Sequence, residues 1–291
     1  MIKKMILALL AIGCFTTSCS NDDDNTGPST SNLTLNLQGL EALGDDYVYE
    51  GWIIVNGAPV STGTFSDVSS AQVFLVDSDQ LNNATRFVLS IEPAVDPDPA
   101  PADTKVLVGD FSGSSATLNS DGIVADFSSA SGTYILATPT DMDDTNEASG
   151  VWFLDNSSGS PATGLNLPTL SAGWQYEGWV VFDGTPVSTG TFIDPAMADN
   201  NAATSPYKGT AGNGPGYPGE DYLIGSAAGV TFPTDLKGRT VVISVEPWPD
   251  NSSAPFALKP LAHMVPNNAA DHSAITMGTG PVVSVSGTAT R

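Results

Sequence analysis

Cysteine and positive charge are scarce in this chain. Its 291 residues include two cysteines and nine lysines and arginines, against 32 aspartates and glutamates, so the net charge is −23. Both cysteines, Cys14 and Cys19, lie near the N-terminus. The rest of the chain therefore has no thiol for a disulfide, a zinc thiolate site or a cysteine nucleophile. Binding to nucleic acid requires clustered Lys and Arg. The basic residues beyond Lys4 are scattered, and we expect no nucleic acid partner.

Histidine is also rare, which limits the chemistry. His263 and His272 are the only two, and their separation does not match the helical spacing of a zinc-ligand pair. A serine triad needs a base near its nucleophile, and the first half of the chain has no histidine. We therefore expect no enzyme activity, no cofactor and no metal centre. Three acidic stretches lack the spacing of known calcium loops and are interpreted as solvated turns: residues 77–79, 96–98 and 141–144.

The N-terminus has the pattern of a secretory signal peptide, which we place at residues 1–18. Two lysines precede an apolar run at residues 6–12 that is too short to span a membrane, and small residues follow it. The sequence Thr-Thr-Ser-Cys that ends at Cys19 resembles a bacterial lipobox. We expect Cys19 to be lipidated and to attach the protein to a membrane. Cys14 is the alternative, although it would shorten the apolar run.

An acidic segment, residues 19–32, follows the predicted lipidation site. Its composition favours a disordered tether. The three aspartates at 22–24 resemble the surface-export signals of Bacteroidota-type lipoproteins. The predicted location is therefore the outer membrane or cell surface, with the periplasmic face as second choice.

The most informative feature that is present is an internal repeat. Residues 49–65 read YEGWIIVNGAPVSTGTF and residues 176–192 read YEGWVVFDGTPVSTGTF, with 12 of 17 positions identical. A second block, residues 87–93, matches residues 241–247 and ends in Glu-Pro in both copies. The offset grows from 127 to 154, so the second copy holds an insertion of 27 residues. A repeat at fixed spacing indicates a duplicated structural unit.

Short apolar runs bounded by Gly, Pro, Asn and Asp predict an all-β fold. Asn56-Gly57 and Asp183-Gly184 indicate type I′ hairpin turns. We expect two tandem β-sandwich modules, Ig-like or related, at residues 33–129 and 130–291. Residues 156–163 are the competing boundary. The insertion lies at about 193–239. It is interpreted as a surface excursion that can be deleted, or as a ligand loop with three candidate contacts: Tyr207, Tyr217 and Tyr222.

The repeated motifs, in their order, resemble the extracytoplasmic domain of anti-sigma-K factors. In that family a Trp strand leads to a Pro-Val-Ser-x-Gly-x-Phe return, and a later strand ends in Glu-Pro. The resemblance implies an extracytoplasmic β domain, whereas we expect no cytoplasmic sigma-binding domain and no spanning helix in this chain. The residues that carry the resemblance are Trp52, Pro59, Gly63, Phe65 and Glu92, then Trp179, Pro186, Gly190, Phe192 and Glu246.

These features predict a non-enzymatic lipoprotein of the cell envelope, with a binding, interaction or structural role toward an unidentified extracellular or periplasmic ligand or protein. The alternative is an enzyme or accessory protein that acts on polysaccharide. Such an enzyme needs two carboxylates about 5–10 Å apart across a cleft. Glu50 and Glu92 are the candidates in the first copy, and Glu177 and Glu246 in the second.

Overall fold

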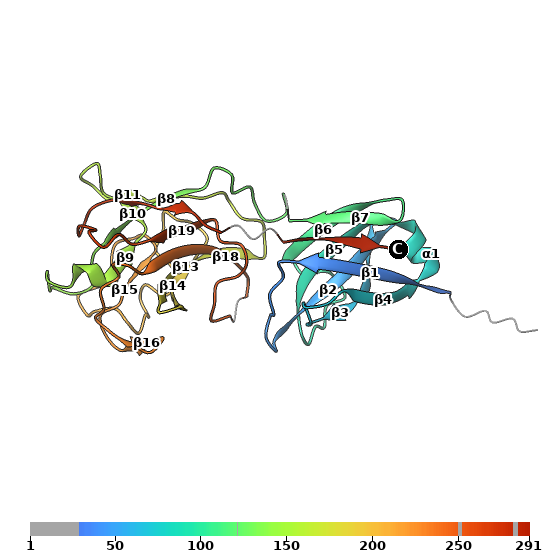
Figure 1. Cartoon of the computed structure of the whole chain (residues 1–291), viewed down its shortest axis with the longest axis horizontal. Coiled ribbons are helices and arrows are strands. Elements are labelled where there is room, and N and C mark those ends of the chain that lie inside the picture. The colour runs from blue at the N-terminus through green and yellow to red at the C-terminus, as the bar shows by residue number, and fades with distance from the viewer. Residues whose placement is uncertain (1–28, 121, 250–251, 282–284) are drawn as a thin grey trace, which may run out of the picture.

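A computed structural model describes residues 29–120, 122–249, 252–281 and 285–291. The described chain is nearly all β, which confirms the predicted class, and it forms two lobes placed end to end (Figure 1). Its helices are short: α1 (Ser78–Asn83) has six residues and η1 (Glu147–Ser149) has three. The predicted signal peptide, Cys14, Cys19 and most of the tether lie outside the described residues. The tether was expected to reach residue 32, but the first strand already begins at Thr30.

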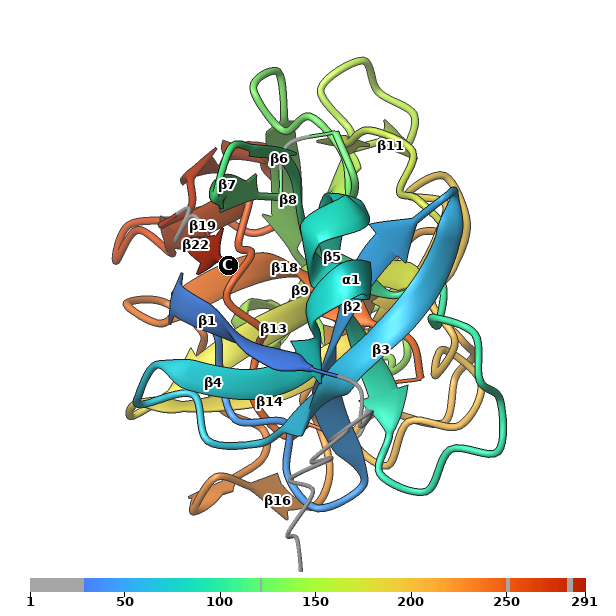
Figure 2. The same cartoon turned by 90° about the vertical axis from the view of Figure 1, so that its right-hand side faces the viewer.

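The first lobe is an antiparallel sheet of eight strands in the order β3-β2-β5-β6-β7-β22-β1-β4. Figure 2 looks at the free end of this lobe, where β1, β3, β4 and α1 face the viewer. Its strands are β1 (Thr30–Gln38), β2 (Tyr47–Val55), β3 (Ala58–Phe65), β4 (Gln72–Asp77), β5 (Ala84–Pro93), β6 (Lys105–Ser112), β7 (Ser115–Asn119) and β22 (Ser286–Thr290).

The second lobe contains two five-stranded sheets and two short hairpins. One sheet has the order β14-β13-β18-β19-β21; the other has the order β12-β8-β9-β15, with β20 also paired to β8. The longer strands are β8 (Ser131–Leu136), β9 (Gly150–Trp152), β13 (Trp174–Phe182), β14 (Thr185–Phe192), β15 (Gly219–Asp221), β18 (Thr240–Pro247) and β19 (Leu261–Met264). The two-residue strands are β10 (Leu154–Asp155), β11 (Ala162–Thr163), β12 (Leu165–Asn166), β16 (Ser226–Ala227), β17 (Val230–Thr231), β20 (Ile275–Thr276) and β21 (Gly278–Thr279).

The repeated block forms the same bulged hairpin in both lobes. Asn56 and Asp183 take φ of 53° and 51°, and each is followed by a glycine at positive φ, as a type I′ turn requires. The pairing register shifts at the same point, between Gly51 and Trp52 in β2 and between the matching residues of β13. Local sequence therefore determines both the turn and the bulge.

The last strand of the chain does not belong to the lobe that precedes it. β22 lies between β7 and β1 in the first lobe (Figure 1). In the second lobe the corresponding place, between β20 and β9, is filled by β8, which directly follows β7 in the chain. Each copy thus donates its last strand to the other lobe. Both donated strands contain Ser-Gly-Thr, at residues 131–133 and 286–288.

This exchange corrects the predicted module boundaries. Residues 130–291 were expected to form one module, but residues 286–290 complete the first sheet. The side chain of Arg291 then anchors the chain end, since its Nη1 donates to the carbonyls of Leu81 and Ala84 at the end of α1. Local periodicity in the sequence indicates where strands form. It does not indicate which strands pair, because the partners lie far apart in the chain.

The insertion is also part of the second lobe and is not a removable excursion. It supplies β15, which pairs with β9, and it buries Tyr222, Phe232 and Leu236 in the core. Buried apolar residues from both lobes form one continuous cluster. The lobes also contact each other through a hydrogen bond of 3.1 Å from Thr104 Oγ1 to the Gly173 carbonyl.

Candidate functional site

The repeated tryptophan and glutamate belong to one hydrogen-bonded chain in each lobe. In the first lobe, Trp52 Nε1 donates to Ser90 Oγ at 2.8 Å, and Ser90 Oγ donates to Glu92. In the second lobe, Trp179 Nε1 donates to Ser244 Oγ at 2.7 Å, and that hydroxyl donates to Glu246. All these side chains are buried. In each lobe these hydrogen bonds therefore link the strand that carries the tryptophan to the neighbouring strand that carries the serine and the glutamate: β2 to β5, and β13 to β18.

Each buried glutamate also closes the Pro-rich loop that follows it. Glu92 Oε1 accepts the backbone N–H of Ala102 at 2.8 Å, and Glu246 accepts that of Phe256 at 2.9 Å. Burial raises the pKa of Glu92 above the usual carboxyl range. Glu50 accepts the Ser61 hydroxyl and lines a surface hollow that Glu92 does not line. The described positions of Glu50 and Glu92 fit a structural role at loops and strand edges.

The remaining motif residues shape the hairpins. Pro59 and Pro186 are the second residues of β3 and β14. Both strands lie at the edge of their sheet and pair with their hairpin partners, β2 and β13. Gly63 and Gly190 have φ of 124° and 114°, a region that favours glycine. Phe65 stacks on Tyr49 with ring centroids 5.4 Å apart, and Phe192 on Tyr176 at 5.6 Å.

The tyrosines of the expected ligand loop do not converge on one binding surface. Tyr222 is fully buried, in contact with Phe182 and Phe232, so it cannot contact a ligand in this structure. Tyr207 packs on the same aromatic cluster and is partly buried. Tyr217 packs against a separate small cluster that contains Trp152. The insertion uses its aromatic residues mainly for packing, because each lobe needs apolar side chains to bury its sheets.

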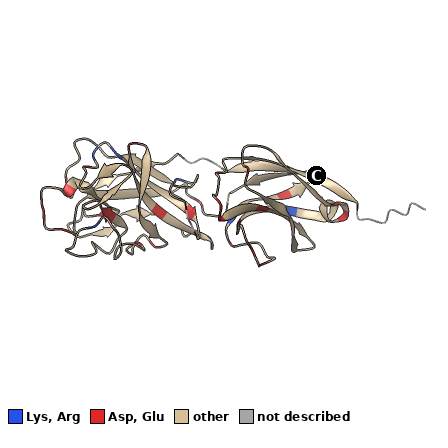
Figure 3. Cartoon of the chain, turned by 90° about the horizontal axis from the view of Figure 1, so that it is seen from below, with Lys and Arg blue, Asp and Glu red and all other residues tan. Residues whose placement is uncertain are grey.

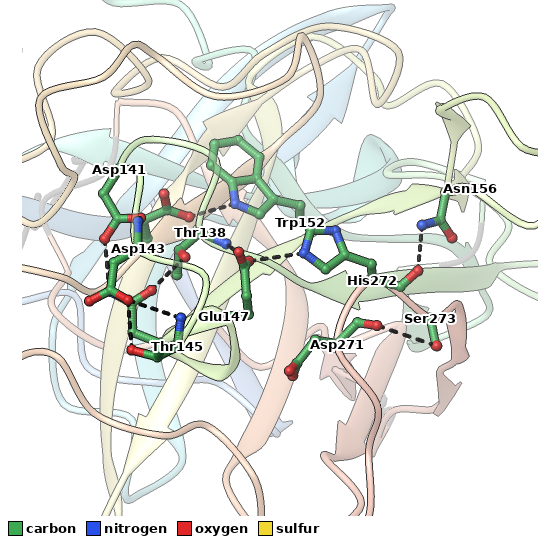
Figure 4. Close-up of polar contacts among 12 residues, drawn as sticks. Thr138, Asp141, Asp143, Thr145, Glu147, Trp152, Asn156, Asp271, His272 and Ser273 are labelled. Carbon is green, nitrogen blue, oxygen red and sulfur yellow. Dashed lines mark hydrogen bonds and ion pairs between the residues drawn. The ribbon is translucent and has the colours of Figure 1, made fainter.

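His272 contacts Glu147, which follows the acidic stretch at 141–144 (Figure 4). His272 Nε2 is 3.1 Å from Glu147 Oε2, and Glu147 accepts the Thr138 backbone N–H at 2.7 Å. Asp143 accepts both the N–H and the hydroxyl of Thr145. The loop is therefore held by its own hydrogen bonds. Within the described part of the chain, no group of three or more His, Cys, Asp or Glu side chains is placed to hold a metal ion.

A groove of about 670 Å³ lies on the second lobe. Its walls come from residues 170–175, which lead into β13, and residues 191–200, which follow β14; Trp248, after β18, completes it. The backbone N–H of Trp248 donates to the Gly173 carbonyl at 2.8 Å, which joins two of these segments. Trp174 and Phe192 are buried residues of the lining.

This groove gathers exposed apolar side chains. Ile193, Met197 and Trp248 are 72%, 62% and 55% exposed, and all three line it. They are three of the nine large apolar side chains that are exposed among the described residues, so the groove concentrates them. Exposed apolar patches mark interaction sites more often than single exposed residues do. Sequence reasoning missed the groove because its walls come from three separate segments. One feature of the sequence could have indicated the groove: Trp248 occupies the position where the first copy has Ala94.

A family model described as the C-terminal part of the anti-sigma-K factor RskA matches residues 26–106. The match spans the first copy of the repeat, from before β1 into β6. It confirms the predicted anti-sigma-factor-like resemblance for this part of the chain. No curated protein and no solved structure matches the chain. Among the described residues, no helix is long and apolar enough to cross a membrane.

Proposed function

We propose that this protein is a non-enzymatic binding protein of the cell envelope, built from two related sandwich modules, and that the groove of the second lobe binds an apolar segment of a partner polypeptide. The supporting observation is the concentration of Ile193, Met197 and Trp248 around one groove. Trp and Met are enriched in the cores of protein interfaces. The family match supports an origin related to the sensory region of anti-sigma factors.

The proposed partner carries basic residues beside its apolar anchor. Acidic side chains are spread over both lobes and basic ones are few (Figure 3). Asp194 is exposed on the groove itself. A positively charged partner would approach this surface faster, because opposite charges steer encounter. Polar groups at the groove are few, which favours an apolar peptide side chain over a sugar as the group that enters it.

Two buried side-chain N–H groups in the groove lining favour a peptide ligand over a hydrocarbon ligand. Trp174 Nε1 and Gln175 Nε2 have no hydrogen-bond acceptor among the described residues. Each unsatisfied donor costs about 1–3 kcal/mol. A backbone carbonyl of a bound peptide that reached these groups would supply the missing acceptor.

The test is peptide selection on the purified protein, followed by binding measurements. A displayed library of random peptides is selected on the wild type, and the enriched peptides are synthesised with a fluorescent label. We expect enriched sequences with Leu, Ile, Phe or Trp beside Lys or Arg. Fluorescence anisotropy should show at least tenfold weaker binding by Met197→Ser and Trp248→Ala, equivalent to about 1.4 kcal/mol.

The matched control is Leu75→Ala, because Leu75 is also an exposed apolar residue but lies on β4 of the first lobe. It should bind the selected peptides as the wild type does. Equal loss of binding in Leu75→Ala, or no effect of either groove variant, contradicts the proposal. Binding of soluble oligosaccharides in place of peptides would also contradict it.

We further propose that lipidated Cys19 anchors the protein to the outer membrane, with the body on the cell surface. The motif at residues 16–19 and the acidic residues after it support this. Cys19→Ala should move the protein from the membrane fraction to the soluble fraction or block its maturation, whereas Cys14→Ala should not. Loss of membrane attachment in Cys14→Ala alone would assign the lipid to the other cysteine.

A further inference from the structure

Three buried oxygen atoms of the second lobe lack a hydrogen-bond donor. They are Asp199 Oδ1, Asn201 Oδ1 and Glu220 Oε2, and none of these three atoms has a partner of good geometry among the described residues. The carboxyl groups themselves are hydrogen-bonded: Asp199 accepts backbone N–H groups, that of Gly219 among them, and Glu220 accepts the Asp221 N–H and the Ser205 hydroxyl. The side chains of Asp199 and Glu220 are only 6% and 2% exposed. Buried polar atoms in folded proteins almost always have partners, so each exception points to a missing group.

The backbone brings the segments that carry these atoms together. Asp199 Oδ2 accepts the backbone N–H of Gly219 at 2.8 Å, which places the start of β15, and with it Glu220, beside the turn at Asp199. A Cβ atom on Gly190 would lie 2.3 Å from Asn201 Oδ1 and 2.7 Å from Asp199 Cγ. The side chains of Asp199 and Asn201 therefore face the same point next to β14. Any side chain at position 190 would clash with these groups, so glycine permits their close approach to β14.

The two carboxylates have no nearby positive charge. None of the ion pairs among the described residues includes Asp199 or Glu220. A buried carboxylate is normally paired or bound to a metal.

The first lobe has an apolar ring in the matching place. A Cβ atom on Gly63 would lie 2.9 Å from the ring of Phe74, the counterpart of the oxygen atoms that face Gly190. Phe74 pairs with the buried Leu33 of β1, just as Glu220 pairs with the buried Val151 of β9. The fold therefore does not require oxygen atoms here. Their presence in the second lobe is specific to that copy.

We propose that Asp199, Asn201 and Glu220 bind a calcium ion that joins the turn after β14 to β15. Calcium prefers carboxylate, amide and backbone carbonyl oxygens and tolerates irregular geometry. Two carboxylates neutralise the ion, the amide is the third ligand, and backbone carbonyls or water complete the shell. The proposal rests on other observations than the peptide groove, although Asp199 belongs to the segment 191–200 that forms one wall of the groove, and it does not involve the acidic loop at 141–144.

The test is binding of calcium, and of terbium as its luminescent substitute, to the chelator-treated full protein. Tyr222 lies two residues from Glu220 and should sensitise terbium luminescence. We expect a saturable luminescence signal that calcium displaces, and a calcium-dependent rise in Tm that magnesium does not reproduce. Asp199→Asn and Glu220→Gln keep the side-chain shapes and should abolish both effects.

Two further variants keep the test decisive. Asn201 is only partly buried, so Asn201→Ala should fold and weaken terbium binding by roughly ten- to a hundredfold. Asp143→Asn, in the acidic loop, should bind as the wild type does. Absence of binding by the wild type, or unchanged binding by Asn201→Ala and Glu220→Gln, overturns the proposal. Loss of binding in Asp143→Asn alone overturns it as well, because the ion would then occupy the acidic loop.

Discussion

At the scale of single residues, a buried serine links the tryptophan and the glutamate of each repeat. Ser90 and Ser244 each accept from a Trp indole and donate to a Glu carboxylate two residues further along the same strand. The serine thus connects the buried indole N–H to the buried carboxylate. Such buried networks stabilise a fold when every member is satisfied and are costly when one member is missing.

We therefore expect Ser90→Ala and Ser244→Ala each to lower the free energy of unfolding by about 1–3 kcal/mol, because a buried indole N–H loses its acceptor and the carboxylate loses the hydroxyl while it keeps its backbone donor. Chemical denaturation of each variant measures the loss. Ser114→Ala, at an exposed turn, is the control and should change stability by less than about 0.5 kcal/mol. Equal stability of the buried-serine variants and the wild type would mean that the chain of hydrogen bonds contributes nothing.

Glu92 should make stability depend on pH. Burial raises its pKa in the folded state above the ordinary value of 4.5, while the nearby Glu50 and Asp96 raise it further and hydrogen bonds oppose the rise. The folded state then holds this proton to higher pH than the unfolded chain does. The free energy of unfolding should therefore fall as pH rises from 4.5 through the raised pKa.

Glu92→Gln tests this dependence, since glutamine keeps the acceptor for Ser90 and Ala102 but does not titrate. Its stability curve should fall less steeply than that of the wild type across this window. Asp45→Asn, an exposed change in the same lobe, should follow the wild-type curve. Identical curves for Glu92→Gln and the wild type would show that Glu92 has the same pKa in the folded and unfolded states.

At the scale of elements, the insertion works as a structural segment of the second lobe. β15 adds the edge of the β8–β9 sheet, and Phe232 packs against Phe182, Tyr207 and Tyr222. Aromatic side chains contribute large buried areas. The insertion's abundant Gly and Pro indicate an irregular path but say nothing about burial.

Deletion of residues 200–231 with a short Gly/Ser linker should therefore unfold the second lobe. Phe232→Ala should cost about 3–5 kcal/mol, the usual loss for a buried aromatic side chain. Met264→Ala, an exposed change in the same lobe, is the control and should cost less than about 0.5 kcal/mol. Calorimetry would contradict this assignment if the deletion variant kept the wild-type Tm.

At the scale of the whole molecule, the exchanged strands tie the two lobes together. The chain leaves the first lobe after β7, builds the second lobe from β8 onward, and returns at β22. Neither lobe is complete without residues from the other copy. Their buried side chains accordingly form one continuous cluster.

Because the strands are exchanged, a mutation in a donated strand should destabilise the lobe that receives this strand. A Cβ atom on Gly287 would lie 2.5 Å from the Asn36 carbonyl oxygen in β1, and one on Gly132 would lie 2.8 Å from the Leu261 side chain. Gly287→Ala should lower hydrogen-exchange protection in the first lobe, and Gly132→Ala in the second, each by about 1–3 kcal/mol of stability. Each lesion would instead appear in the lobe nearest in sequence if the strands were not exchanged.

Much of the local structure could be predicted from the sequence. The all-β class, the Asn-Gly and Asp-Gly turns, the matching hairpins and the burial of Trp52 and Trp179 follow from patterns within about ten residues. Of the sites, the repeated Glu92 and Glu246 were recognised as residues of the shared motif and as candidate carboxylates of the enzymatic alternative, but the loops that they close were not. The groove was not recognised, because Trp248 and Met197 lie some fifty residues apart and only folding brings them together.

By itself, the sequence determined the strands, the turns and the duplication, because each depends on side-chain alternation, on residues that accept positive φ, or on a copied motif. Only the tertiary structure decided which strands pair, where residues 286–290 belong and which side chains of the insertion are buried. The repeated Ser-Gly-Thr shows that β8 and β22 correspond, but not that they exchange. A donated strand can make the same kind of backbone hydrogen bonds in either lobe. Which lobe it joins is therefore determined by long-range packing and by the chain segment that connects it to the preceding strand.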